Sequence, residues 1–161
     1  MNDIVRAIGQ DPLHPAAIEF IEELSLIAEA EGVPRIAGRI VGLLLVQPEP
    51  LSFDDIVEQL HVSRASVSTN TRLLESRGAI RRVSRLAERR DFFEAGPDFL
   101  ERLYERRIQR ERAGRQIAAK ARAALPAGYA RTKEALKRME ELHSLMIDAI
   151  EKVLHRWNKR R

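Results

Sequence analysis

Residues 51–95, LSFDDIVEQLHVSRASVSTNTRLLESRGAIRRVSRLAERRDFFEA, decide the fold. The stretch begins with a strong helix start. Ser52 stands at an N-cap position, and Asp55 stands three residues later, where its side chain can return a hydrogen bond to the cap as a capping box. We therefore expect a short helix that ends near Leu60.

The same pattern of helix start returns after only two residues. Ser63 is the second N-cap, and Gly78 is placed to end the second helix in the left-handed conformation that glycine adopts without strain. Two short helices joined by a tight turn form a helix-turn-helix. The sequence therefore predicts that motif, with its second helix running from about Ser63 to Arg77.

A β-hairpin is expected directly behind this helix. Two extended runs, 80–83 and 89–94, flank a tip at 84–88, and the second run contains two adjacent phenylalanines. A hairpin in this position is what a winged helix-turn-helix requires.

Two further helices are expected before the motif. Apolar residues recur at helical spacing from Pro15 to Ala30. A second helix, from Pro34 to the Pro48 stop, is apolar nearly all round and should be buried. Gly38 and Gly42 lie four residues apart in it, and glycine in a helix costs stability, so we expect another backbone to approach closely there.

Two long helical stretches follow the hairpin, over 96–125 and 129–157, separated by a Pro-Ala-Gly break. The last one carries a seam in steps of three and four: Leu136, Met139, His143, Met146, Ile150, Val153 and Trp157. The seam needs a partner helix. That partner is either intramolecular or a second copy of the chain, and a seam this regular favours dimerisation.

The expected fold class is mainly α with a small β-hairpin wing. We expect an N-terminal arm and dimerisation helix at 1–33, a winged helix-turn-helix at 34–95, and a C-terminal helical dimerisation region at 96–161. A chain of 161 residues is long enough for one such domain with helical extensions.

The net charge of +4 conceals an asymmetry. Residues 1–62 carry a balance of −8 and residues 63–161 a balance of +12. Half of that excess lies in residues 63–90, where eight arginines face two glutamates. Such a cluster is a candidate footprint for a polyanion, and a solvated arginine-rich surface is the competing interpretation.

Other function classes find little support. The chain has no cysteine, its four histidines are scattered without metal-ligand spacing, and it has no phosphate-binding glycine loop or nucleophile motif. We therefore expect neither an enzyme nor a cofactor or metal site. No apolar run approaches the length of a membrane span, so a cytoplasmic location without membrane attachment is expected.

Three segments resemble a known family. The entry helix G-x-P-R-x-A-G-R-I-x-G-L-L-L from Gly32, the S-R-x-S-V-S start at Ser63, and R-R-D-F-F-E-A from Arg89 are similar to the GbsR branch of the MarR-like winged-helix regulators. The similarity covers roughly residues 15–125. It departs at the tip, where Ser84–Ala87 replaces the family's usual glycine turn, and in the longer C-terminal seam.

The resemblance implies a homodimer that presents two recognition helices to successive major grooves of double-stranded DNA. It also implies that the protein is a transcriptional regulator and acts as a repressor. Related regulators often respond to small molecules, some of them quaternary ammonium compounds. Such cations favour an aromatic cage. Phe20, Phe99 and Tyr104 are the candidates, and the effector's identity stays open.

The candidate base-reading residues come from helical geometry. At about 100° per residue, Val67, Thr71 and Leu74 fall in one narrow arc and should be buried. The opposite arc contains small hydroxyl residues and an arginine, from which we select Ser66, Ser68, Thr69 and Arg72 for DNA contact. Arg64, in the first turn, should meet a phosphate. Asn70 ranks below them because it lies close to the buried arc.

Five arginines crowd the hairpin: Arg81, Arg82, Arg85, Arg89 and Arg90. Arg85, Arg89 and Arg90 are our candidates for DNA contact, and Arg85 and Arg89 for the minor groove. Arg89 matches the family's wing arginine and Arg85 does not. An ion pair with Glu88 or Asp91 is the competing role. The alternative for the whole chain is a winged-helix adaptor that binds proteins and not specific DNA.

Overall fold

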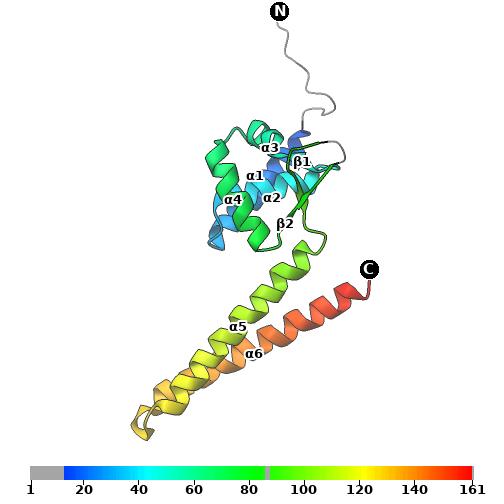
Figure 1. Ribbon diagram of the computed structural model, residues 1–161. Helices are drawn as coiled ribbons and strands as arrows, with labels where there is room; N and C mark the ends of the chain where they lie inside the picture. The colour runs from blue at the N-terminus through cyan, green and yellow to red at the C-terminus, as the bar shows by residue number, and fades with distance from the viewer. Residues whose placement is uncertain (1–12, 86–87, 161) are drawn as a thin grey trace, which may run out of the picture. The chain divides into compact units, whose positions relative to one another are not determined.

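The computed structural model describes residues 13–85 and 88–160. Figure 1 shows the elements in chain order: α1 (Pro15–Ala30), α2 (Arg35–Val46), β1 (Leu51–Ser52), α3 (Phe53–Leu60), α4 (Arg64–Ser76), β2 (Ile80–Val83), β3 (Phe92–Ala95), α5 (Phe99–Ala124), a 3₁₀ turn (Ala127–Tyr129) and α6 (Ala130–Asn158). The chain divides into two compact units after Pro97. Within the described ranges, no helix is long and apolar enough to cross a membrane. The fold is mainly helical with a small sheet, as expected.

Helices α1 and α2 pack at unusually short range. A Cβ atom added at Gly38 would lie 2.8 Å from the Cα of Ser25, and one added at Gly42 would lie 3.1 Å from the Cα of Ile21. The predicted close approach is therefore confirmed, and α1 is its partner. This contact ties α1 into the same compact unit as the winged helix.

The helix starts form as local chemistry dictates. The Ser52 hydroxyl accepts from the backbone N–H of Asp55 at 3.2 Å, and the Asp55 carboxylate accepts from the backbone N–H of Ser52 at 2.8 Å, which completes the capping box. The Ser63 hydroxyl caps α4 by accepting from the backbone N–H of Ser66 at 3.1 Å. Gly78 follows α4 with a φ of +63°, the left-handed conformation predicted for it.

The sheet has one strand more than the predicted hairpin. Its order is β1-β3-β2, all antiparallel, with Leu51 opposite Phe93 and Val83 opposite Phe92. The prediction missed β1 because two residues are too few to show an alternating pattern. The start predicted for the second strand, Arg89, was also wrong: the ladder closes at the Val83–Phe92 pair, so β3 begins only at Phe92. Leu86 and Ala87 of the predicted tip lie outside the described residues.

An aliphatic core with two buried phenylalanines, Phe92 and Phe93, holds the first unit together. Its largest fully buried side chains come from α2, the sheet, α3 and α4: Ile40, Leu43, Leu51, Ile56, Val67 and Phe93. Because α4 buries one face in this core, its opposite face is held in a fixed position at the surface.

The second unit is a hairpin of α5 and α6, which lie side by side in Figure 1. The predicted seam of α6 divides between two faces. Leu136, His143 and Ile150 are half-buried against α5. The other four members, Met139, Met146, Val153 and Trp157, are between 37% and 56% exposed. The intramolecular partner therefore covers only part of the apolar surface.

Candidate nucleic-acid interface

Helix α4 presents a polar face that is free of core packing. Val67, Thr71 and Leu74 are no more than 3% exposed, so the predicted buried arc is confirmed. The opposite arc is exposed or half-exposed: Ala65, Ser68, Thr69, Arg72 and Ser76. Small side chains dominate this arc and let the backbone of α4 come close to a flat or grooved partner.

Several polar groups of α4 already have partners within the helix. The Nη2 of Arg72 donates to the Ser68 hydroxyl at 2.8 Å, so this arginine lies along the helix surface. The Ser66 hydroxyl accepts from the Ser63 hydroxyl at 3.0 Å. Asn70 is buried and its amide donates to the Ser66 carbonyl at 2.8 Å, which explains why it is not part of the outer face.

Arg64 stands at the first position of α4. Its guanidinium lies 5.0 Å from the centre of the Phe53 ring and forms an ion pair with Asp54. The Arg64 side chain remains 69% exposed. It is thus held in place at the N-terminal end of α4, where the helix dipole also attracts anions.

Four of the five wing arginines are paired with carboxylates, three of them with residues of the hairpin or of α4. Arg81 pairs with Glu94. Arg82 donates to Glu75 at 3.2 Å and to Asp91 at 2.9 Å, and the hydrogen bond with Glu75 is the main cause that raises the pKa of Arg82. Asp91, one of the partners expected for the tip arginines, is therefore used by Arg82.

Arg90 is the third paired arginine. It binds Glu88 at 2.7 Å, and this hydrogen bond raises the pKa of Arg90. Glu88, the other partner expected for the tip, is thus taken by Arg90. Since both side chains are mostly at the surface, the pair contributes little to stability.

The two tip arginines are held differently. Arg85 donates to Glu49 at 3.0 Å and to the carbonyl of Pro50 at 3.3 Å, and it lies 4.6 Å from the centre of the Phe92 ring. Glu49 is a partner that sequence reasoning missed, because it is 36 positions away. Arg89 is exposed, and no described side chain pairs with it.

The interface is close to electrically balanced before any ligand binds. Residues 49–95 contain eight arginines and eight acidic residues. The arginine excess of residues 63–90 is therefore offset by the carboxylates of the segments before and after it in the sequence, 49–62 and 91–95. An anionic partner has to compete with these carboxylates for the same guanidinium groups.

The model of the MarR family matches residues 31–91, which span α2 to the approach to β3. This part of the chain is therefore similar to the winged helices of the MarR family. The whole chain is also 29% identical to the HTH-type transcriptional regulator MmpR5 of Mycobacterium tuberculosis, over 99% of this chain and 96% of that protein. A crystal structure of a transcriptional regulator, 28% identical, covers 90% of this chain and 99% of its own, with a TM-score of 0.73.

The hairpin of α5 and α6 carries a partly buried polar cluster. The Nδ1 of His143 lies 2.6 Å from Glu111, and Arg107 donates to the same carboxylate at 2.8 Å. The hydrogen bond with His143 is the main cause that lowers the pKa of Glu111. The imidazole lies over Gly114, where an added Cβ would be 2.6 Å from two ring atoms. His143 is therefore a packed, partnered residue.

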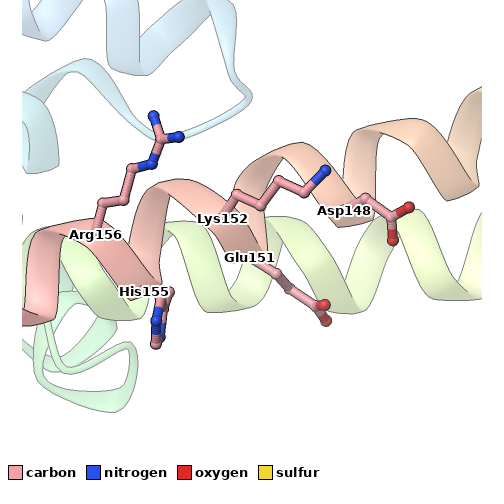
Figure 2. Close-up of a pocket in the computed structure, with 5 residues that line it drawn as sticks. All are labelled: Asp148, Glu151, Lys152, His155 and Arg156. Atoms are coloured by element: carbon pink, nitrogen blue, oxygen red, sulfur yellow. The ribbon is translucent and has the colours of Figure 1, made fainter.

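A shallow depression lies on α6, with a volume of about 350 Å³ (Figure 2). All of its lining residues come from that one helix: Asp148, Glu151, Lys152, His155 and Arg156. Glu151 of this lining is already paired with Arg112 at 2.7 Å. In the described ranges, no group of three or more His, Cys, Asp or Glu residues could hold a metal ion.

The aromatic residues proposed for an effector site lie in separate units. Phe20 belongs to the unit with the winged helix and is 42% exposed, whereas Phe99 and Tyr104 belong to the hairpin. Tyr104 is 44% exposed.

Proposed function

We propose that this protein is a sequence-specific, double-stranded-DNA-binding transcriptional regulator that acts as a homodimer on an inverted repeat. The observation that carries the proposal is the outer face of α4: a row of small polar side chains with one arginine, beside an arginine-rich wing. An α-helix of this kind fits the major groove of B-DNA, where base edges carry a distinct pattern of donors and acceptors.

Each candidate residue has a role in this complex. Ser68 and Thr69 let α4 approach the groove floor, and Arg72 leaves Ser68 to bind a guanine edge or a phosphate. Ser66 and Arg64 face the phosphates at the start of α4. In the wing, Arg89 and Arg90 meet phosphates or a narrow minor groove, together with Arg85 when it leaves Glu49.

The proposed dimer rests on the apolar surface that α5 leaves uncovered on α6. Met139, Leu142 and Met146 are 43%, 61% and 37% exposed and lie at spacings of three and four. A second copy of the chain would cover this stripe and place two α4 helices on successive grooves, so half-site centres should lie about 34 Å apart. Repression, a GbsR-type relationship and a small-molecule effector are further parts of the proposal.

Selection of DNA fragments by the purified protein tests the proposal directly. We expect an enriched inverted repeat with the half-site spacing given above. Enrichment of a single asymmetric site bound by one chain would contradict the dimer model. No enrichment of any sequence would favour the alternative, a winged-helix adaptor that binds proteins.

A further inference from the structure

Four arginines of the candidate interface share one arrangement, a phenylalanine ring on one side and a carboxylate partner: Arg64, Arg82, Arg85 and Arg90. Arg85 lies against the Phe92 ring and donates to the Glu49 carboxylate. Arg64 lies against the Phe53 ring and pairs with Asp54. Each guanidinium therefore has an aromatic face on one side and a carboxylate at its donor edge, which defines a resting position for it in the free protein.

Glu49 is well placed to hold this position. It stands between Pro48 and Pro50, each of which fixes its own φ, and a residue before a proline is restricted to extended backbone. The Glu49 side chain is 73% exposed, so it has no packing role. The Pro50 carbonyl, at 3.3 Å, adds a further acceptor for Arg85. The loop thus offers Arg85 a pre-positioned pair of oxygen acceptors.

A carboxylate and a DNA phosphate compete for the same arginine, because both accept charge-assisted hydrogen bonds from its guanidinium. We propose that Glu49 occupies Arg85 as an intramolecular substitute for phosphate and is a specificity-determining residue. A phosphate of a loosely docked, nonspecific duplex does not displace Glu49. A phosphate fixed by the correct docking of α4 does. This inference rests on the proposed DNA-binding function.

Arg89 provides the contrast within the same wing. It is exposed and has no carboxylate partner among the described residues, so it is available to the phosphates of any sequence. The wing would then contain one arginine for general attraction and one that responds to the fit of the complex. Glu49 is what separates the two roles.

The test is the affinity of Glu49→Gln for a cognate and a scrambled duplex, measured by fluorescence anisotropy over a salt series. Exposed ion pairs are weak, so we expect the scrambled duplex to be bound about two- to fivefold more tightly. Its salt dependence should steepen by up to about 0.9 log units per protomer, because Arg85 gains a phosphate contact. Cognate binding should change less, so the ratio of cognate to scrambled affinity falls.

Two controls separate this effect from a change in net charge. Glu58→Gln removes one exposed charge from α3, where no described side chain pairs with Glu58, and it should tighten scrambled DNA less than Glu49→Gln does. In an Arg85→Ala background, Glu49→Gln should give no more gain than Glu58→Gln gives. A Glu49→Gln gain equal to that of Glu58→Gln, or an excess over Glu58→Gln that persists without Arg85, overturns the inference while wild-type DNA binding stands. Wild-type protein that binds no duplex overturns the proposed function and this inference with it.

Discussion

The two compact units differ in what holds them together. The winged-helix unit buries apolar side chains from every layer, among them Ile40, Leu43 and Phe93. The α5–α6 hairpin buries far less: Ile108, Ala118 and Ile147 are its buried apolar residues in the described range. Two of its other buried residues are the carboxylates Glu101 and Glu111. The first unit has its own hydrophobic core, whereas the hairpin has only a narrow line of apolar contacts between its two helices.

Polar pairs replace a core in the hairpin. The Nε1 of Trp157 donates to Glu101 at 2.8 Å, and Arg122 binds Glu140 at 2.6 Å. Partly buried polar pairs fix the register of two helices better than they stabilise them, because desolvation offsets most of the attraction. The comparison indicates that the hairpin depends on a further partner for stability, whereas the winged helix does not.

The largest expected effect, on oligomeric state and operator affinity, comes from disrupting the proposed dimer interface on α6. Leu142 and Met146 lie on the exposed stripe of α6, and glutamates at both positions would place charges in the proposed dimer interface. We expect wild type to sediment as a dimer at micromolar concentration and the double variant as a monomer. Operator affinity should fall about 10²- to 10⁴-fold, because the second half-site is no longer bound intramolecularly.

A charge reversal elsewhere on the same helix is the matched control. Lys152→Glu, at an exposed position away from the stripe, should leave the dimer intact. Circular dichroism should show unchanged helix content for all variants. A wild-type protein that sediments as a monomer would remove the dimer and the paired-half-site model together.

Core truncation should affect the two units unequally. Phe93 is 2% exposed between α2 and the sheet, and Phe93→Ala should destabilise the winged helix by about 3–5 kcal/mol. Ile147→Ala in the hairpin should cost about 2 kcal/mol, the low end for such a change, since its cavity opens near solvent. Urea unfolding measures both. Equal losses would contradict the difference we infer between a core and a seam.

Base reading should be separable from phosphate attraction. Arg72→Ala should weaken the cognate site by about 1–3 kcal/mol and scrambled DNA less. Arg89→Ala in the wing should weaken all duplexes more evenly and flatten the salt dependence by roughly 0.9 log units per lost contact. Anisotropy on both duplexes measures the two effects. A wing variant with unchanged affinity and salt dependence would leave the arginines as a solvated surface and favour the adaptor function.

The smallest effect concerns acid stability of the hairpin. The hydrogen bond from His143 holds the pKa of Glu111 below its ordinary value of 4.5. The ionised carboxylate therefore stabilises the folded state above that value, and the stabilisation is lost as pH falls through the lowered pKa. Glu111→Gln should be less stable than wild type near neutral pH and lose less stability on acidification. Thermal melts across pH 2–7 would show this.

Glu105→Gln is the control for that measurement. Glu105 lies on the same helix and is exposed, and no described side chain forms an ion pair with it. Its variant should follow the wild-type pH profile. If Glu111→Gln also follows it, the His143 contact does not contribute to hairpin stability.

Local features of the fold were predictable because their partners are close in sequence. The Ser52–Asp55 capping box joins residues three positions apart, and Gly78 ends α4 through its own backbone freedom. The buried arc of α4 follows from helical periodicity alone. The candidate DNA-contacting residues of α4 were chosen from helical geometry and those of the wing from the crowding of arginines, and all of them remain a prediction.

Only the tertiary structure decided which strands, side chains and helix faces contact one another. The two-residue strand β1 exists only because β3 lies beside it, and Arg85 is held by Glu49 because the fold brings the two together across 36 positions. The division of the α6 seam likewise depends on which face α5 covers. The sequence determined caps, periodicity and charge because these act within one or two turns of the chain. Pairings over long separations depend on packing, which no local pattern encodes.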